Sequence, residues 1–197
     1  MPVRSRWLGA LVVLGFGLCS CLEVPAPPPK NALDVKDVKA PPGVELDTAC
    51  TATGVELCFD ARDNNCNGVI DEGCGLHTGI LQFTIAWEGA DADVDLNVSD
   101  VGGEVAAPPG QTTAGGLIKD KDCPKQCHGQ NVENVFLAEG EPRRGRYRAV
   151  IRLDKLNGAT APVRVRFGAR IGQRSFGMNV DLSPGAGNEE RTFEFTL

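Results

Sequence analysis

Apolar and polar residues alternate along most of the chain after Leu76. Alternation with a period of two places one side of a strand in a core and the other side in solvent. The runs are separated by Gly, Pro and Asn, and none of them has the period of a helix. They cover Leu81 to Trp87, Val94 to Val98, Tyr147 to Leu153, Val163 to Ile171, Phe176 to Leu182 and Phe193 to Leu197. Short strands of this kind predict a mainly β chain, with an antiparallel β-sandwich over residues 76–197.

The first twenty residues have the pattern of an export signal. Arg4 and Arg6 precede an apolar run from Trp7 to Leu18, which is too short to span a bilayer. The run ends in a segment that resembles the lipobox of bacterial lipoproteins, which implies cleavage after residue 20 and acylation of Cys21, with palmitate among the chains. By resemblance to lipoprotein sorting, the residues that follow imply the outer membrane. A plain signal peptide or an uncleaved anchor is the alternative.

A proline-rich segment follows the lipid anchor. Residues 22–49 contain six prolines, interspersed charges and no apolar period. This composition is typical of an extended, semi-rigid tether, so we expect a linker without folded elements over residues 21–49. The chain has 20 basic and 26 acidic residues, a net charge of −6. Nucleic acid is therefore not an expected partner.

Six cysteines remain beyond the signal segment, and an even number in an exported chain favours disulfide bonds. Four of them are each eight residues apart, and the other two form a local pair later in the chain. They are Cys50, Cys58, Cys66, Cys74, Cys123 and Cys127. Four cysteines allow three pairings, among which the sequence does not choose. A thiolate metal site or haem attachment with His128 is the alternative for the later pair.

Oxygen-bearing side chains recur at alternate positions inside the cysteine-rich segment. Asp63, Asn65 and Asn67 occupy the first, third and fifth places of a loop, followed by Gly68 at the sharp turn and Asp71 at the ninth place. This order is the front half of a calcium loop, because a hard cation needs several oxygens from a tightly curled backbone. A cysteine occupies the twelfth place, where an EF-hand has a glutamate. We therefore expect a shorter, disulfide-clamped loop.

Residues 50–75 resemble the MopE-type metal-binding motif of bacterial surface proteins in their cysteines, acids and glycine. The resemblance implies a cation site whose ligands match the motif by position. These ligands are Asp60, Asp63, Asn65, Asn67, Asp71, Glu72 and the carbonyl group of Val69. The set consists of oxygen atoms, so Ca²⁺ is the expected cofactor, at an affinity lowered by the two asparagines. The alternative is a solvated linker whose Asp and Asn residues only form turns.

The region from Gly79 to Leu197 resembles the YfaP-like domain of exported bacterial proteins. The residues that carry this resemblance are Trp87, the run from Asp93 to Val98, Gly115 to Leu117, Asp120 to Asp122, Gly129 to Asn134 and Gly145 to Tyr147. The resemblance implies the β-sandwich fold and no particular activity.

Five acids of this region form a second candidate cation site. Asp93 and Asp95 project from one face of a strand, and we expect Asp120, Asp122 and Glu133 to lie beside them on loops. Like charges in this arrangement repel one another unless a cation lies between them. The alternative is ordinary cross-strand pairing with arginines.

Five arginines at alternate positions of two predicted strands form a candidate docking surface. They are Arg148, Arg152, Arg164, Arg166 and Arg170. We expect an outward cationic stripe that docks anionic polysaccharide or lipid headgroups, because the guanidinium fork matches carboxylate and phosphate. A solvated face that protects strand edges is the alternative.

The sequence contains no nucleophile motif, phosphate loop or metalloprotease motif. We therefore expect a non-catalytic, lipid-anchored envelope or cell-surface protein, which binds Ca²⁺ and presents a β-sandwich for binding or adhesion. Its expected partners are the membrane, through the lipid anchor, and a polysaccharide or surface protein. The alternative is an accessory or carbohydrate-active hydrolase component that uses paired carboxylates of the β-domain.

Overall fold

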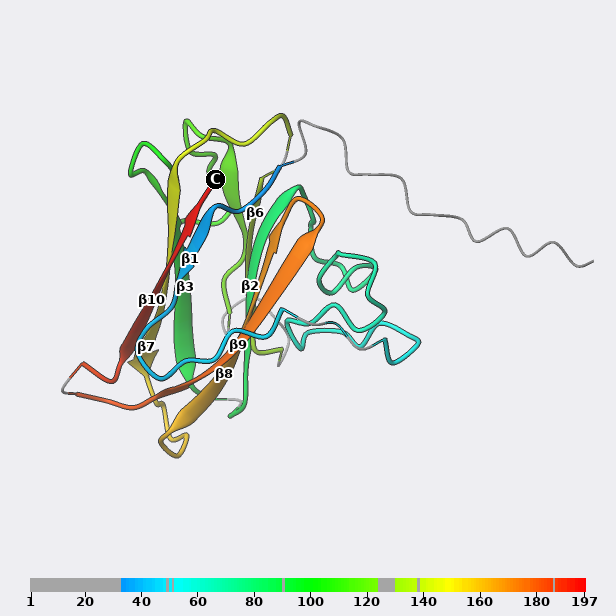
Figure 1. Ribbon diagram of the computed structural model, residues 1–197. Helices are drawn as coiled ribbons and strands as arrows, with labels where there is room; N and C mark the ends of the chain where they lie inside the picture. The colour runs from blue at the N-terminus through cyan, green and yellow to red at the C-terminus, as the bar shows by residue number, and fades with distance from the viewer. Residues whose placement is uncertain are drawn as a thin grey trace, which may run out of the picture. The chain divides into compact units, whose positions relative to one another are not determined.

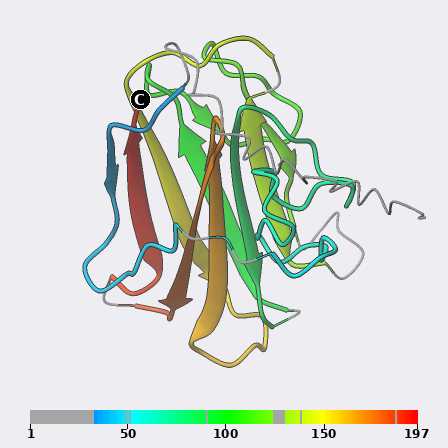
Figure 2. The ribbon, with the colours of Figure 1, turned by 45° about the vertical axis from the view of Figure 1, so that its right-hand side comes forward.

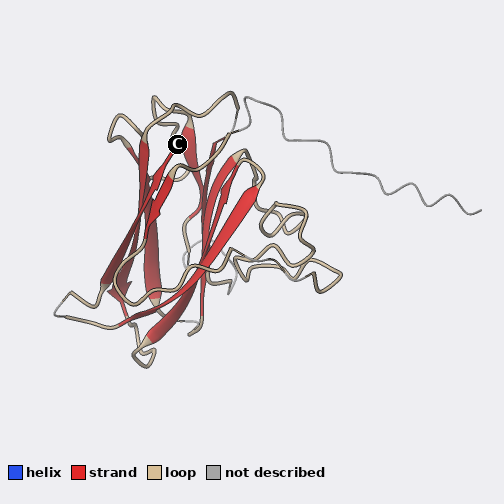
Figure 3. Cartoon of the chain, viewed as in Figure 1, coloured by secondary structure: helices blue, strands red, loops and turns tan. Residues whose placement is uncertain are grey.

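Two antiparallel sheets form the body of the protein (Figures 1 and 3). The computed structural model describes residues 33–48, 50, 52–89, 91–123, 130–137, 139–185 and 187–197. Every regular element in these ranges is a strand, and no helix there is long and apolar enough to cross a membrane. The predicted signal segment and Cys21 lie outside the described residues.

The strands are divided equally between the two sheets, which face each other in Figure 2. The first sheet has the order β1-β10-β7-β3-β4, and the second has the order β5-β6-β2-β8-β9. The strands are β1 (Asp37–Lys39), β2 (Leu81–Trp87), β3 (Asp93–Ser99), β4 (Val105–Ala106), β5 (Leu117–Lys121), β6 (Val132–Leu137), β7 (Arg146–Lys155), β8 (Val163–Ile171), β9 (Arg174–Leu182) and β10 (Glu190–Thr196). This arrangement confirms the predicted antiparallel β-sandwich.

Aromatic side chains from both sheets fill the centre of the sandwich. Phe83 on β2 and Phe167 on β8 come from the second sheet, and Phe193 and Phe195 on β10 come from the first. The ring centroids of Phe167 and Phe193 lie 4.9 Å apart, and those of Phe83 and Phe195 lie 5.6 Å apart. These side chains are fully buried because strand alternation turns every second residue towards the opposite sheet.

Strand β2 departs from the half-buried pattern that its sequence predicts. All seven of its residues are buried, including the polar Gln82 and Thr84. The cysteine-rich segment covers the outer face of β2, and the Gln82 amide donates to the carbonyl oxygen of Ile70 at 2.9 Å. The Thr84 hydroxyl donates to Asn134 Oδ1 on β6 at 2.8 Å, so both buried side chains donate hydrogen bonds, although Gln82 Oε1 has no partner among the described residues.

The segment before the first cysteine corrects the expectation of a tether without folded elements. Residues Asp37–Lys39 form β1, an edge strand that pairs with β10. Val35 is buried against the core, and Asp47 forms a β-bridge with Gly177. A three-residue edge strand needs only backbone partners and one or two apolar side chains, so it leaves no periodic pattern in the sequence. Residues 31–197 accordingly form one compact unit, which includes the cysteine-rich segment.

Candidate functional site

Two overlapping disulfides brace the cysteine-rich segment. Cys50 is bonded to Cys66 and Cys58 to Cys74, each across a separation of 16 residues. The second bond begins inside the loop that the first one closes, so the two crosslinks constrain the same stretch of chain. Cys123 is also disulfide-bonded, and Cys127 lies outside the described residues.

The segment between these bonds contains unusual backbone conformations. Among the described residues, five non-glycine positions have positive φ, and four of them lie here: Phe59, Ala61, Cys66 and Asp71, with φ between 51° and 66°. Conformations of this kind cost free energy and persist where the surrounding structure fixes them. The two disulfides and the dense hydrogen bonding described next supply that constraint.

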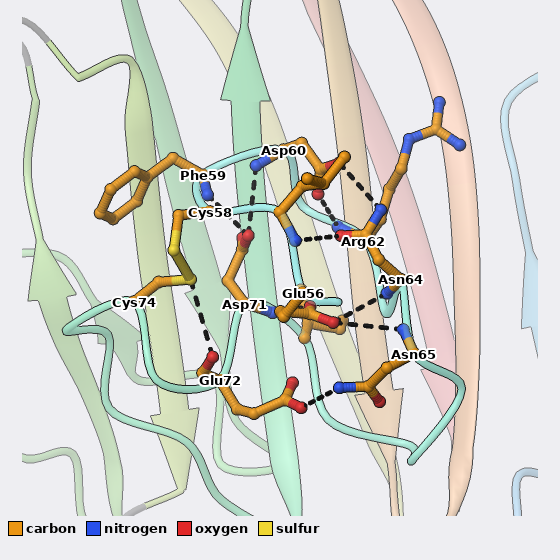
Figure 4. The surroundings of a disulfide bond; sticks show 12 residues. Glu56, Cys58, Phe59, Asp60, Arg62, Asn64, Asn65, Asp71, Glu72 and Cys74 are labelled. Carbon is orange, nitrogen blue, oxygen red and sulfur yellow. Dashed lines mark hydrogen bonds between the residues drawn. A yellow bond between two sulfur atoms is a disulfide. The ribbon is translucent and has the colours of Figure 1, made fainter. Parts of the chain in front are cut away.

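Asp71 is fully buried, and its carboxylate accepts three backbone hydrogen bonds, of which those from Phe59 and Asp60 can be followed in Figure 4. Its Oδ1 accepts from the amides of Phe59 at 2.7 Å and Asp60 at 3.2 Å, and its Oδ2 accepts from Ala61 at 3.1 Å. Positive φ at positions 59 and 61 directs these successive N–H groups into one concavity, a backbone anion nest. Burial nevertheless raises the pKa of Asp71 to about 7. The occupant of the nest is thus a carboxylate of the chain itself.

Glu56 organises the other side of the loop, and the sequence patterns gave no indication of this role. Its Oε2 accepts from the backbone amides of Asn64 at 3.0 Å and Asn65 at 3.3 Å, and its Oε1 accepts from the amide of Asp71 at 3.0 Å. Burial and then the nearby charge of Glu72 raise the pKa of Glu56. The residue lies seven positions before the calcium-like pattern begins, so only the folded chain brings it there.

The side chains of the predicted calcium loop curl the backbone from residue 63 to residue 69. Asp63 Oδ1 accepts from the amide of Asn67 at 3.0 Å, and Asp63 Oδ2 accepts from Gly68 at 2.8 Å. Asn65 Oδ1 also accepts from the amide of Asn67, at 3.0 Å, and Asn67 Oδ1 accepts from Val69 at 2.8 Å. Successive bonds of this kind turn the backbone tightly and gather the first, third and fifth side chains of the pattern.

Glu72 reaches back to the same side chains. Its Oε1 accepts from the side-chain amides of Asn65 and Asn67. Its Oε2 is buried and has no hydrogen-bond partner among the described residues. A buried carboxylate oxygen without a partner is costly in a protein, and such atoms commonly mark a water or ion site.

Two of the sequence-predicted ligands lie apart from this group. The carboxylate of Asp71 is enclosed by its three backbone donors, and Asp60 accepts from the amide of Arg62 at 3.0 Å and the side chain of Asn64 at 3.2 Å. The structure therefore brings together Asp63, Asn65, Asn67 and Glu72, with Val69 within the same turn. Asp60 and Asp71 instead fix the preceding stretch of backbone.

The second candidate cation site contains a cation from the chain itself. Carboxylate oxygens of Asp95, Asp122 and Glu133 lie within 4.8 Å of one another. The Lys119 ammonium group, 2% exposed, lies 2.8 Å from Asp122 and 2.9 Å from Glu133. Burial would lower the pKa of Lys119, but these acids outweigh burial and raise it. Burial raises the pKa of Glu133 although Lys119 opposes that change.

The structure does not bring the other two predicted acids into contact with that ammonium group. Asp120 accepts from the backbone amide of His77 at 2.8 Å and contacts its ring nitrogen, because alternation along β5 points it away from Lys119. Asp93 starts β3 opposite Lys155. Asp120 and Glu133 also lie on strands, not on the loops that we expected.

The predicted arginine stripe is divided between the two sheets. Arg148 and Arg152 belong to β7 in the first sheet, whereas Arg164, Arg166 and Arg170 belong to β8 in the second. The two strands have similar patterns but lie in different layers, so they form no common surface. The expectation of one continuous stripe was wrong, and the arginines of β8 lie beside the cysteine-rich segment.

Comparisons with protein-family models, with curated proteins and with solved structures give no match for this chain.

Proposed function

We propose that the turn from Asp63 to Glu72 binds Ca²⁺ and that the chain is a non-catalytic, lipid-anchored envelope protein. The observation that carries the proposal is the buried, unpartnered Oε2 of Glu72, a residue whose other carboxylate oxygen contacts the side-chain amides of Asn65 and Asn67 in the turn that Asp63 curls. Carboxylate and carboxamide oxygens are the donors that a hard cation prefers. The charge of Arg170 acts on Glu72 and Asp63, but no ion pair among the described residues includes Glu72, so a cation would supply a direct contact.

The hydrogen bonds within the turn are compatible with ligation. A carboxylate or carboxamide oxygen has two lone pairs, so it can accept a backbone N–H and still contact a cation. Asp63, Asn65 and Asn67 would contribute side-chain oxygens, Val69 its carbonyl oxygen, and Glu72 its carboxylate. Two acids and two amides give a ligand charge of −2, fewer charges than the sites that bind Ca²⁺ most tightly.

The hydrolase alternative receives no support from the geometry of the β-domain. Glycoside hydrolysis by paired carboxylates requires two acids that reach the substrate. Glu133 is fully buried, and its Oε2 is bonded to Lys119 and to the amide of Leu96 at 2.6 Å. We therefore keep the non-catalytic proposal.

Calorimetric titration of the oxidised mature protein with Ca²⁺ tests the cation site. We expect saturable heat with one site per chain, and Glu72→Gln should weaken binding by at least tenfold because it removes one of two ligand charges. Glu45→Gln is the matched control, since Glu45 is an exposed acid outside the loop. Absence of heat, or equal affinity for wild type and Glu72→Gln, would refute calcium binding at this turn.

Fractionation of cells tests the membrane part of the proposal. Cys21→Ala removes the acylated residue, so the variant should move from the membrane fraction to the soluble fraction. Retention of Cys21→Ala in the membrane fraction would contradict a lipid anchor at this position and would leave the calcium result unaffected.

A further inference from the structure

A polar cleft separates the cysteine-rich segment from the outer face of β8 and β9. It consists of two hollows, one of about 280 Å³ and one of about 650 Å³, and Arg62 and Arg166 line both. The larger hollow has the volume of a typical small-ligand site. Its wall on the cysteine-rich side includes Phe59 and Asp60, and its floor on β2 includes Trp87.

Arg166 is held in this cleft with much of its hydrogen-bonding capacity unused. Its side chain is 13% exposed, and its Nε is buried without a partner among the described residues. Its two outer nitrogens lie 3.5 Å from Asp47 and 3.4 Å from Asn179, both at the long end of hydrogen bonding. The guanidinium lies against Gly177, where an added Cβ would be 1.8 Å from Nη2. The glycine thus makes room for the arginine.

A second guanidinium lies near the first. The Arg62 side chain extends from the cysteine-rich segment, away from the Asp71 nest, as Figure 4 shows. Arg62 and Arg166 line the same two hollows, and burial first, and then the charge of Arg62, lowers the pKa of Arg166. An anionic group between them would offset the unfavourable charge of Arg62 and engage planar donors that match a carboxylate.

The charged side chains that line the larger hollow limit the kind of ligand that it can bind. Arg62, Arg164 and Arg166 supply three positive charges, and Asp60, Glu88 and Asp181 supply three negative charges, so the sum is zero. A dense polyanion would be repelled by the three acids. A ligand with single carboxylates separated by hydroxyl groups satisfies both kinds of side chain, because carboxylates accept hydrogen bonds from hydroxyl groups and guanidinium groups donate hydrogen bonds to carboxylates.

We propose that this cleft binds a carboxylate-bearing saccharide, with its carboxylate at Arg62 and Arg166 and its hydroxyl groups at Asp60, Asn179 and Asp181. The half-buried Phe59 also lines this hollow and adds apolar surface. None of the proposed Ca²⁺ ligands lines the larger hollow, although Asp63 lines the smaller one.

Titration with a galacturonate trisaccharide in the presence of EDTA tests the proposal on the full mature chain. The chelator keeps Ca²⁺ out of the measurement, so a failure here is separable from a failure of the calcium site. We expect saturable binding that the methyl ester of the same trisaccharide does not reproduce. Arg62→Gln should weaken it by about tenfold or more, the loss expected for a charge-assisted hydrogen bond.

Arg148→Gln provides the matched control, because Arg148 is 47% exposed and lies on the other sheet. Arg62 is exposed, so its replacement should leave the melting temperature unchanged, and Asn179→Ala provides a second variant within the cleft. The proposal is overturned if no binding is seen, if the methyl ester binds equally well, or if inorganic phosphate displaces the saccharide at equal concentration. Equal losses in Arg62→Gln and Arg148→Gln would also overturn it.

Discussion

The cysteine-rich segment and the β-sandwich fold by different means within one compact unit. The sandwich buries a continuous set of apolar side chains from both sheets. The cysteine-rich segment buries only Ala61 and Ile70 of its apolar residues and relies on two disulfides and side-chain-to-backbone hydrogen bonds. The first region is stabilised mainly by burial of apolar area, and the second by restriction of the unfolded chain.

The two regions also neutralise their buried acids in different ways. In the cysteine-rich segment, Asp71 and Glu56 are satisfied by backbone N–H groups, which carry only partial charge. In the sandwich, Glu133 and Asp122 contact a full ammonium charge on Lys119. The comparison explains why we place the expected Ca²⁺ at Glu72 and not at the sandwich acids: the sandwich acids already have a cation.

The largest expected effect follows from removal of the sandwich cation. Lys119→Met leaves Glu133 and its neighbours as uncompensated buried acids, so the free energy of unfolding should fall by about 3–5 kcal/mol. Chemical denaturation at pH 7 measures this change. Lys155→Met is the control, because Lys155 pairs with Asp154 on the surface and its loss should have no measurable effect. Equal stability of Lys119→Met and wild type would show that the ion pair does not support the fold.

The second prediction distinguishes the stability of the cysteine-rich segment from that of the sandwich. Replacement of Cys58 and Cys74 by Ser opens a crosslink that spans 16 residues, which costs about 3 kcal/mol in the chain-entropy model. Hydrogen exchange should therefore accelerate at the amides of Phe59 and Ala61, whereas the amide of Ile151 in β7 should remain protected. Calcium affinity should fall in the same variant. Unchanged protection of Phe59 would mean that the hydrogen bonds alone maintain the segment.

A smaller effect tests the contact between the regions. Gly168 on β8 faces the cysteine-rich segment, and an added Cβ would lie 2.5 Å from the carbonyl oxygen of Ala61 and 3.0 Å from Ile70 Cδ1. Gly168→Ala should therefore displace the segment and cost about 1–3 kcal/mol, the usual range for overpacking. Exchange at the Gln82 side-chain amide, which bonds to Ile70, reports the displacement by NMR. An unchanged Gln82 signal would contradict close packing at this contact.

The sequence predicted the strands in which apolar and polar residues alternate. It did not predict which strands are buried on both faces by other parts of the chain. Strands β3 and β7 alternate in burial as their patterns predict. Strand β6 is buried on both faces, so its sequence has no period of two. Its polar residues Glu133 and Asn134 bond to Lys119 on β5 and to Thr84 on β2. Pairings across long separations, such as those of these two residues, leave no local pattern.

The candidate site was predictable in the same partial way. The alternate spacing of Asp63, Asn65 and Asn67 is local, and the structure brings these side chains to one turn. Asp71 shares that spacing, but positive φ at its neighbours creates a nest that encloses its carboxylate, which spacing does not reveal. Glu56 lies outside the pattern and reaches the turn only through the fold.

The smallest expected effect concerns the pH dependence of the sandwich. Burial first, and then the acids Asp93, Asp154 and Asp122, raise the pKa of Asp95, while Lys119 opposes the change. The folded state thus binds this proton more tightly than the unfolded chain does. The corresponding stability is fully present below the ordinary pKa of 3.8 and is lost as pH rises through the folded-state pKa.

Asp95→Asn removes this titration, so its free energy of unfolding should decline less between pH 4 and pH 8 than that of wild type. The gain at pH 8 should be about 0.5 kcal/mol, the size of interactions between partly exposed charges. Denaturation at the two pH values measures the difference. Asp34→Asn is the control, because Asp34 is exposed and contacts only Arg174 among the described ion pairs. A steeper decline in Asp95→Asn would contradict this expectation. It would mean that the attraction between Asp95 and Lys119 outweighs the repulsion between Asp95 and the neighbouring acids. Three carboxylates, not two, would then share the ammonium group.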